Sequence, residues 1–175
     1  MDILYGINEI TLRMLAYAVG GVGVLVEMRA YSLQSGLAFR RWSAAGALLW
    51  ASQYFLLNAW TAGLTMGCTA LRTMLSGKLT TGLYKHLAAS GFILLFTGLT
   101  WISWQGAVSL LPAFAVINTT LALFYFDNRN MRIALMASSL AWISNDVYWQ
   151  AWPALFAESA AMAINLHTIR RLFKV

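Results

Sequence analysis

Seven apolar runs, each close to the length that crosses a lipid bilayer, take up almost all of this 175-residue chain. A transmembrane helix needs about 20 predominantly apolar residues. Only 10% of the residues are charged, whereas a soluble domain has roughly 25%. The sequence therefore predicts an all-α, polytopic membrane bundle of seven transmembrane helices, a single transmembrane domain over 1–175. We place the spans at 10–28, 42–57, 59–76, 86–102, 107–125, 132–148 and 152–171.

The basic residues are distributed unevenly about this predicted bundle. If the N-terminus lies outside, every Lys and Arg except Arg13 falls in an inner loop, on the C-terminal tail or, for Arg72, near the inner end of a span. This positive-inside distribution predicts an N-out, C-in orientation. The net charge of +6 is then a signal of topology, so we expect the lipid bilayer as a partner and no nucleic acid.

Residues suited to enzymatic or metal chemistry are scarce. Cys68 is the only cysteine, which excludes an intramolecular disulfide and a Cys-based metal site. Ser144 and Asp146 lie toward the outer face of the predicted bundle and His167 toward the inner face, so they do not form a catalytic triad. We therefore predict a protein that is not an enzyme and needs no cofactor or metal.

The chain also contains an internal repeat, in which a shift of 92 positions carries 40–74 onto 132–166 without a gap. Two matched tryptophans in one ungapped register are hard to obtain by chance, and such repetition is a signal of the fold. The informative matches are Arg40 with Arg132, Trp50 with Trp142, Ser52 with Ser144, Gln53 with Asn145, Trp60 with Trp152 and Thr73 with Asn165.

The span at 86–102 has no counterpart under this shift, so we expect it to connect repeat one, at 10–76, with repeat two, at 107–171. Three spans, one connector and three more spans give both halves the same orientation. The expected arrangement is a 3+1+3 bundle of parallel repeats related by an axis along the membrane normal. Transporters use such repeats, with the substrate site near mid-membrane between them.

Each half places an aromatic ring and a side-chain amide on one helical face. Residues three and four apart share a face, which groups Trp50 with Gln53 and Trp142 with Asn145. A ring offers a stacking surface, and an amide offers both a donor and an acceptor. The combination suits a neutral or weakly charged, polar, roughly planar solute. The same pattern is also compatible with interhelical packing and hydrogen bonding.

The last span adds three candidates. Glu158 lies more than one turn inside it, where an acidic side chain is costly. It should face the bundle interior, either as a functional group or in a structural ion pair. Asn165 lies on the same face, and Pro153 lies just above.

The third and fifth spans supply the remaining candidates. Arg72 either lines the interior or extends toward the inner face, and it accompanies a stripe of threonines that includes Thr69 and Thr73. Pro112, in the fifth span, can free a backbone carbonyl and act as a hinge. Asn118, in the same span, is a second-rank candidate for the cavity lining.

Two other acidic residues are expected to be peripheral. Asp146 lies at the outer boundary of its span and is expected to be solvated. Glu27, at the inner end of the first span, is expected to pair with Arg29, Arg40 or Arg41.

Several stretches of the chain resemble a known family. These are WSAAGALLWASQYFLLNAWTAG at 42–63, ALRTML at 70–75, SLLPAFAVINTTLALF at 109–124 and the Glu158, Asn165, Arg170 pattern of the last span. They resemble the YgjV family of bacterial inner-membrane proteins, which is itself distantly similar to SWEET, PQ-loop and Pnu-type transporters. The resemblance implies a place in the bacterial inner membrane, a 3+1+3 bundle and facilitated passage of a small solute.

In SWEET-like proteins a Trp and an Asn from each repeat line the central site. The positions that match here are Trp50, Trp142, Asn165 and, in place of an Asn, Thr73. The chain lacks the Pro-Gln dipeptide and has only two prolines, so the resemblance does not carry over sugar as the substrate.

The sequence therefore predicts a small-solute transporter or facilitator that holds its solute between Trp50 and Trp142. The alternative is a receptor or sensor that reuses a transporter-like bundle and binds a lipid, a peptide or a membrane partner without transport. A homo-oligomer is compatible with either function.

Overall fold

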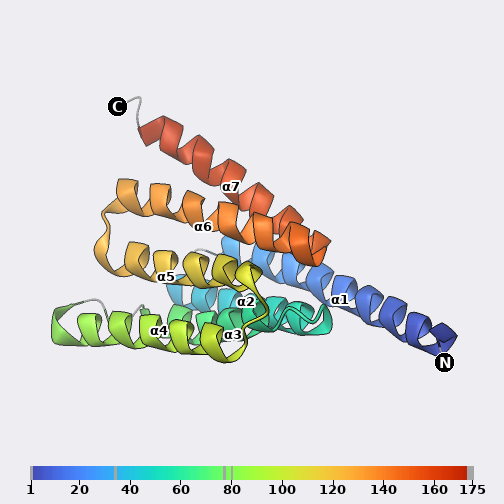
Figure 1. The fold of residues 1–175 in the computed structure, drawn as a ribbon. Helices are drawn as coiled ribbons and strands as arrows, with labels where there is room; N and C mark the ends of the chain where they lie inside the picture. Colours follow the sequence, from blue (N-terminus) through green and yellow to red (C-terminus); the bar gives the residue numbers. More distant parts are fainter. Residues whose placement is uncertain (1, 34, 77, 80, 173–175) are drawn as a thin grey trace.

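The computed structural model describes residues 2–33, 35–76, 78–79 and 81–172, and these segments form a bundle of helices (Figure 1). Over this part of the chain there are seven α-helices and one short 3-10 helix. They are α1 Asp2–Tyr31, α2 Gly36–Leu56, α3 Trp60–Ser76, α4 Gly82–Ile102, η1 Ala107–Ser109, α5 Leu110–Tyr125, α6 Asn128–Trp149 and α7 Trp152–Leu172. The predicted spans fall on these seven helices in order, so the all-α class is confirmed.

Three helical segments are long and apolar enough to cross a membrane by length and composition alone. Within the described residues they are Glu9–Ala30, Gly82–Ile102 and Ala107–Tyr125. The other four helices are shorter or more polar: α3 has 17 residues and includes Arg72, and α6 begins with Asn-Arg-Asn-Met-Arg. Most of the buried polar side chains lie on these four helices, because a helix that turns a polar stripe inward has a lower mean hydropathy.

The helices are arranged as two triplets and one additional helix (Figure 1). In the first triplet α2 packs against both α1 and α3, and in the second α6 packs against both α5 and α7. The triplets meet where α3 contacts α5 and where α1 contacts α7. Helix α4 packs against α3 and α5 through a face that includes Phe92 and Phe96, while Leu94 on its other side is 73% exposed.

The two turns that close the triplets have the same backbone structure at positions 92 residues apart. Asn58 and Gln150 both adopt the left-handed conformation, with φ of 63° and 56°. After each of them an alanine N–H donates a 2.8 Å hydrogen bond to a carbonyl five residues earlier, from Ala59 to Tyr54 and from Ala151 to Asp146. Such turns end helices by satisfying their last carbonyl groups. Figure 1 shows both turns toward the end of the bundle at which α1 begins, and the α3–α4 and α5–α6 connections at the opposite end.

Candidate functional site

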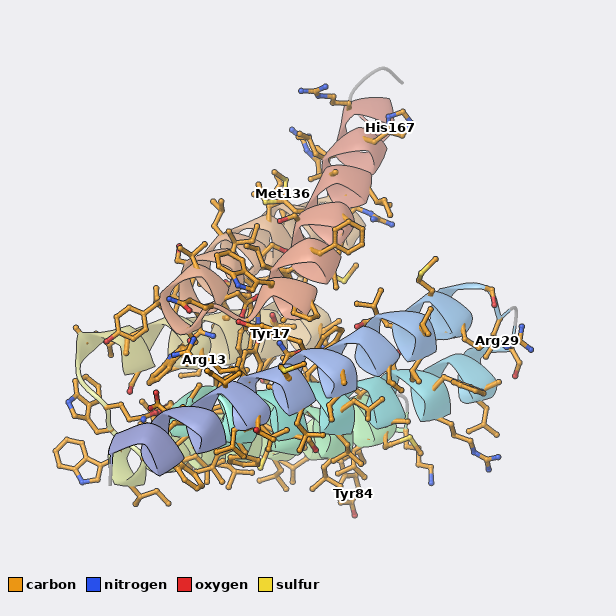
Figure 2. All side chains as sticks on the ribbon, turned by 90° about the vertical axis from the view of Figure 1, so that its right-hand side faces the viewer. Arg13, Tyr17, Arg29, Tyr84, Met136 and His167 are labelled. Atoms are coloured by element: carbon orange, nitrogen blue, oxygen red, sulfur yellow. The ribbon has the colours of Figure 1, made fainter. Side chains whose placement is uncertain are left out.

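A cavity of about 940 Å³ lies between the two triplets and is lined by every α-helix except α4. Its lining begins close to the α2–α3 and α6–α7 turns, at Tyr54, Asp146 and Ala154, and extends along α6 to Arg132 and along α7 to Asn165. Figure 2 shows α1 and α7 diverging from the end marked by Arg13 toward the ends marked by Arg29 and His167. The cavity therefore extends along most of α6, from Asp146 near the α6–α7 turn to Arg132 near the basic ends of the helices.

A hydrogen bond between the two triplets forms the floor of this cavity. The Tyr54 hydroxyl donates to Asp146 Oδ1 over 2.6 Å, and the two side chains are only 2% and 1% exposed. The Tyr54 ring stacks on Trp142, with ring centroids 5.8 Å apart and planes 17° from parallel. The expectation that Asp146 is solvated at the outer boundary is wrong, because the α6–α7 turn continues past it and Tyr54 covers it.

The amides of Gln53 and Asn145 lie outside the cavity lining, although the spacing places them on the faces of Trp50 and Trp142. Both side chains are fully buried, at 0% exposure. A Cβ added at Gly20 would collide with the Gln53 amide and with Pro153, so this glycine provides the space into which the amide packs. Both polar atoms of Gln53, together with Asn145 Oδ1, have no hydrogen-bond partner in the described structure.

A hydrogen bond on the surface joins the two triplets at the end of the bundle beyond these amides. Arg13 Nη1 of α1 donates a 2.6 Å hydrogen bond to Gln150 Oε1 in the α6–α7 turn. Together with the bond between Tyr54 and Asp146, this contact joins the triplets on the side away from the basic helix ends.

The two repeated tryptophans both line the cavity, with Trp50 at 6% and Trp142 at 7% exposure. Trp50 packs against Gly23, where an added Cβ would lie 3.3 Å from the indole ring. Its Nε1 donates a 2.8 Å hydrogen bond to Glu27 Oε2.

The bond from Trp50 gives Glu27 a partner that was not expected, and Glu27 lines the cavity as an acceptor of an indole N–H. Among the described side chains, neither Arg29 nor Arg41 is its partner. The side chain of Arg40, the third expected partner, lies outside the described residues.

Glu158 lies on α7 and faces the interior, where it lines the same cavity. The Ser139 hydroxyl of α6 hydrogen-bonds to it, and Glu158 lies within electrostatic range of both Asp146 and Glu27. The partner that the structure gives Glu158 is thus a serine hydroxyl of the neighbouring helix.

The two arginines of the cavity wall have different surroundings. Arg72 is 4% exposed and donates to the Val116 carbonyl over 3.0 Å and to Thr120 Oγ1 over 2.9 Å, which ties α3 to α5. Its guanidinium lies over the Phe96 ring of α4 at 5.8 Å. The alternative in which Arg72 extends toward the inner face is therefore wrong.

At the other end of the cavity Arg132 and Asn165 join α6 to α7. Arg132 Nη1 donates to Asn165 Oδ1 over 3.1 Å, and Asn165 Nδ2 donates back to the Arg132 carbonyl over 2.9 Å. Arg132 was not among the predicted site residues, although it is the repeat partner of Arg40, just as Asn165 is the partner of Thr73. Thr69 lines the cavity, whereas Thr73 does not.

Three candidates lie outside the cavity lining: Pro112 and Asn118 on α5, and Pro153 on α7. Asn118 Nδ2 donates to the Ala134 carbonyl over 2.6 Å and to Ser138 Oγ over 2.9 Å, which ties α5 to α6. Pro112 and Pro153 lie in the first turns of α5 and α7, where a missing N–H removes no intrahelical hydrogen bond. Pro112 thus frees no carbonyl in mid-helix, contrary to the expectation of a hinge.

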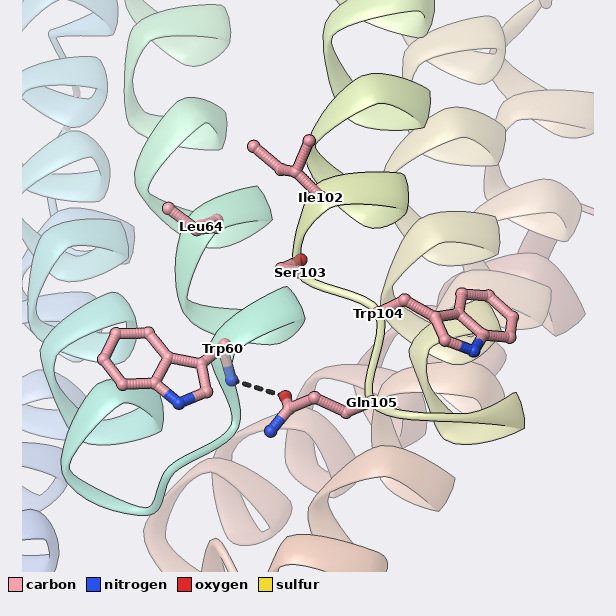
Figure 3. Close-up of a pocket in the computed structure, with 6 residues that line it drawn as sticks. All are labelled: Trp60, Leu64, Ile102, Ser103, Trp104 and Gln105. Carbon is pink, nitrogen blue, oxygen red and sulfur yellow. Dashed lines mark hydrogen bonds between the residues drawn. The ribbon is translucent and has the colours of Figure 1, made fainter.

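A second, shallower pocket of about 370 Å³ lies between the start of α3 and the connection from α4 to η1 (Figure 3). Gln105 Oε1 accepts a 2.7 Å hydrogen bond from the Trp60 backbone N–H, drawn as a dashed line in Figure 3. Trp60 and Trp104 are about half exposed, at 49% and 52%. Because aromatic residues of this kind occur at the headgroup level of membranes and no titratable group lines the pocket, we assign it to the membrane–water interface.

Comparison with known proteins identifies the family. Residues 14–175 match the sequence profile of Imp-YgjV, described as a bacterial inner membrane protein. The chain belongs to the Imp-YgjV family. It is 23% identical to the inner membrane protein YgjV of Escherichia coli (strain K12) over 161 residues, which cover 92% of this chain and 86% of that relative. No solved structure matches the chain.

Proposed function

We propose that this member of the Imp-YgjV family is a facilitator that passes a small polar solute through the bacterial inner membrane without changing it chemically. In this proposal all seven helices span the bilayer, with the N-terminus outside and the basic helix ends inside. The two triplets are parallel repeats related by an axis along the membrane normal, and the solute binds in the cavity between them.

The observation that carries the proposal is the hydrogen bond from Tyr54 to Asp146, whose positions are equivalent in the repeat and 92 residues apart. Two equivalent positions touch each other only close to the axis that relates them. The bond therefore supports an axis through the floor of the cavity, which is where transporters built from parallel repeats hold their substrates.

The cavity geometry supports a state that is open to the cytoplasm. Its lining reaches Met28, Met131 and Arg132 near the basic helix ends, and the contacts from Tyr54 to Asp146 and from Arg13 to Gln150 join the triplets at the other end. In this mechanism, passage of the solute requires both contacts to break while α1 and α7 approach each other at the inner end. Alternation of this kind is achieved by moving one packed unit against another.

The test is a search for ligands followed by uptake. The full chain in detergent is screened by thermal shift against nucleosides, vitamins, sugars and amino acids, and compounds that raise its Tm are then tested for uptake into proteoliposomes. Trp142→Ala removes a stacking surface of the cavity, so it should weaken binding by about tenfold and reduce uptake. Trp152→Ala is the matched control, because Trp152 is 51% exposed on the outside of the bundle.

Two results would contradict the proposed function. If no class of compound raises the Tm, or if Trp142→Ala binds and transports as the unmodified protein does, the proposed function is wrong.

The second candidate is a receptor or sensor, and one observation favours it. A receptor needs access to its ligand from one side only, and the Tyr54–Asp146 contact joins the two triplets at the cavity end away from the basic helix ends. This function predicts saturable binding to the purified chain with no uptake into proteoliposomes.

A further inference from the structure

The acidic residues of this protein are concentrated in the cavity. The chain has six Asp and Glu residues, and three of them, Glu27, Asp146 and Glu158, line the same cavity. They come from α1, α6 and α7, and each lies within electrostatic range of at least one of the others. Acidic residues at membrane depth are costly, and they usually mark a binding site or an ion path.

Within the described structure no basic side chain neutralises these carboxylates. Asp146 accepts from Tyr54 and Asn145 through Oδ1, while its Oδ2 is buried and has no hydrogen-bond partner. Glu27 accepts from the Trp50 indole. The two arginines of the cavity wall are directed elsewhere, since Arg72 donates to Val116 and Thr120 of α5 and Arg132 donates to Asn165. The lining thus carries three carboxylates against two guanidinium groups. Like charges held together out of water repel each other strongly, so the space beside the carboxylates favours a positively charged occupant.

The arrangement of the carboxylates indicates the kind of cation. No group of three or more His, Cys, Asp and Glu side chains in the described residues could hold a metal ion, so the three carboxylates surround the space without converging on one point. The space itself, at about 940 Å³, has the volume of a site for an organic molecule.

Aromatic rings complete the site. The indoles of Trp50 and Trp142 and the phenol ring of Tyr54 all line the cavity, and the Tyr54–Trp142 stack lies directly at Asp146. Tryptophan and tyrosine faces attract organic cations, and such rings together with carboxylates are a recurring way of recognising ammonium groups.

We infer that the solute of this cavity is an organic cation with a planar, delocalised or alkylated nitrogen group, held between the Trp50 and Trp142 indoles with its charge facing Asp146 and Glu158. The inference rests on the proposed transport function, and it gives that function a substrate class.

The test uses three planar compounds that share one ring and differ in charge. They are the 1-methylpyridinium-3-carboxamide cation, neutral pyridine-3-carboxamide and the pyridine-3-carboxylate anion. Binding of each radiolabelled compound to the full chain in detergent is measured by equilibrium dialysis. We expect the cation to bind at least about tenfold more tightly than the neutral compound, as for a hydrogen bond or contact to a charged group, and the anion to bind least.

Charge-neutralising variants assign the effect to the cavity. Asp146→Asn and Glu158→Gln should each weaken binding of the cation by about tenfold or more and leave binding of the neutral compound unchanged. Asp127→Asn and Glu9→Gln are the matched controls, because they remove the same charges from exposed positions and should leave all three compounds unaffected. A Tm measurement on every variant confirms that it is folded.

The outcomes separate this inference from the proposed function. If the neutral compound binds as tightly as the cation, or if both cavity variants bind the cation as the controls do, the inference is overturned and the facilitator proposal stands. If none of the three compounds binds, the inference is also overturned, and uptake of any other solute by the same preparation would preserve the proposed function.

Discussion

Tyr54 and Asp146 occupy equivalent positions of the internal repeat, 92 residues apart, and the hydroxyl of the first donates a 2.6 Å hydrogen bond to the carboxylate of the second. Both side chains are almost completely buried. The same shift relates the left-handed residues Asn58 and Gln150 a turn further along. In the proposed mechanism this bond is the closed gate between the cavity and the outer side of the membrane.

The first prediction concerns the strength of this gate. Tyr54→Phe removes only the hydroxyl and leaves the buried Asp146 carboxylate without that donor. Loss of one partner of a buried polar pair costs roughly 1–3 kcal/mol, so the variant should unfold at a lower denaturant concentration in detergent. Asp146→Asn should cost less in the Tyr54→Phe background than in the unmodified protein. Losses that add within about 0.5 kcal/mol would show that the two residues are not coupled.

A second prediction tests the packing behind the cavity floor. Gly20→Ala places a methyl group against the Gln53 amide and Pro153, and overpacking of this kind costs about 1–3 kcal/mol in the free energy of unfolding. Gly21→Ala is the control on the same helix, because no atom lies within 4 Å of a Cβ there. It should be neutral or stabilising by up to about 1 kcal/mol, since alanine is the better helix former. Equal effects of the two substitutions in chemical unfolding would contradict this packing.

A third prediction concerns Arg72, which we regard as a structural tie between α3 and α5 that also forms part of the cavity wall. Arg72→Gln removes the charge-assisted hydrogen bonds to the Val116 carbonyl and Thr120, each of which contributes roughly 1.5–3 kcal/mol. The variant should therefore lose several degrees of Tm, whereas Arg41→Gln, on an exposed position, should lose none. A variant that keeps its Tm and loses only ligand binding would instead make Arg72 a binding residue.

The helices could be predicted from the sequence because they depend on local pattern. Apolar length defines each helix, and the turns after α2 and α6 repeat because the residues around Ala59 and Ala151 repeat. The inward position of Trp50 and Trp142 also follows from the pattern, since large rings next to small residues such as Gly23 pack between helices.

The cavity lining could not be predicted in full, because it depends on how neighbouring helices share the space. Helical spacing groups Gln53 with Trp50, but the Gln53 amide packs into the space beside Gly20, outside the cavity. Tyr54 lines the cavity instead. Asp146 was expected at the water boundary from its distance to the end of the span. The α6–α7 turn and the contact with Tyr54 of the other triplet bury it.

The central claim is that a chamber between the two triplets opens to the cytoplasm, and cysteine labelling tests it most directly. Cys68, the single cysteine of the chain, is replaced by serine, and Thr69→Cys places a thiol on the cavity wall. Tyr148→Cys serves as the outer reference, since Tyr148 is 62% exposed near the α6–α7 turn. A membrane-impermeant maleimide is added to one side or the other of oriented membrane vesicles. We predict that Thr69→Cys reacts far faster from the cytoplasmic side and Tyr148→Cys only from the opposite side; a Thr69→Cys thiol that is inert from the cytoplasmic side, or that reacts faster from outside, would contradict the account.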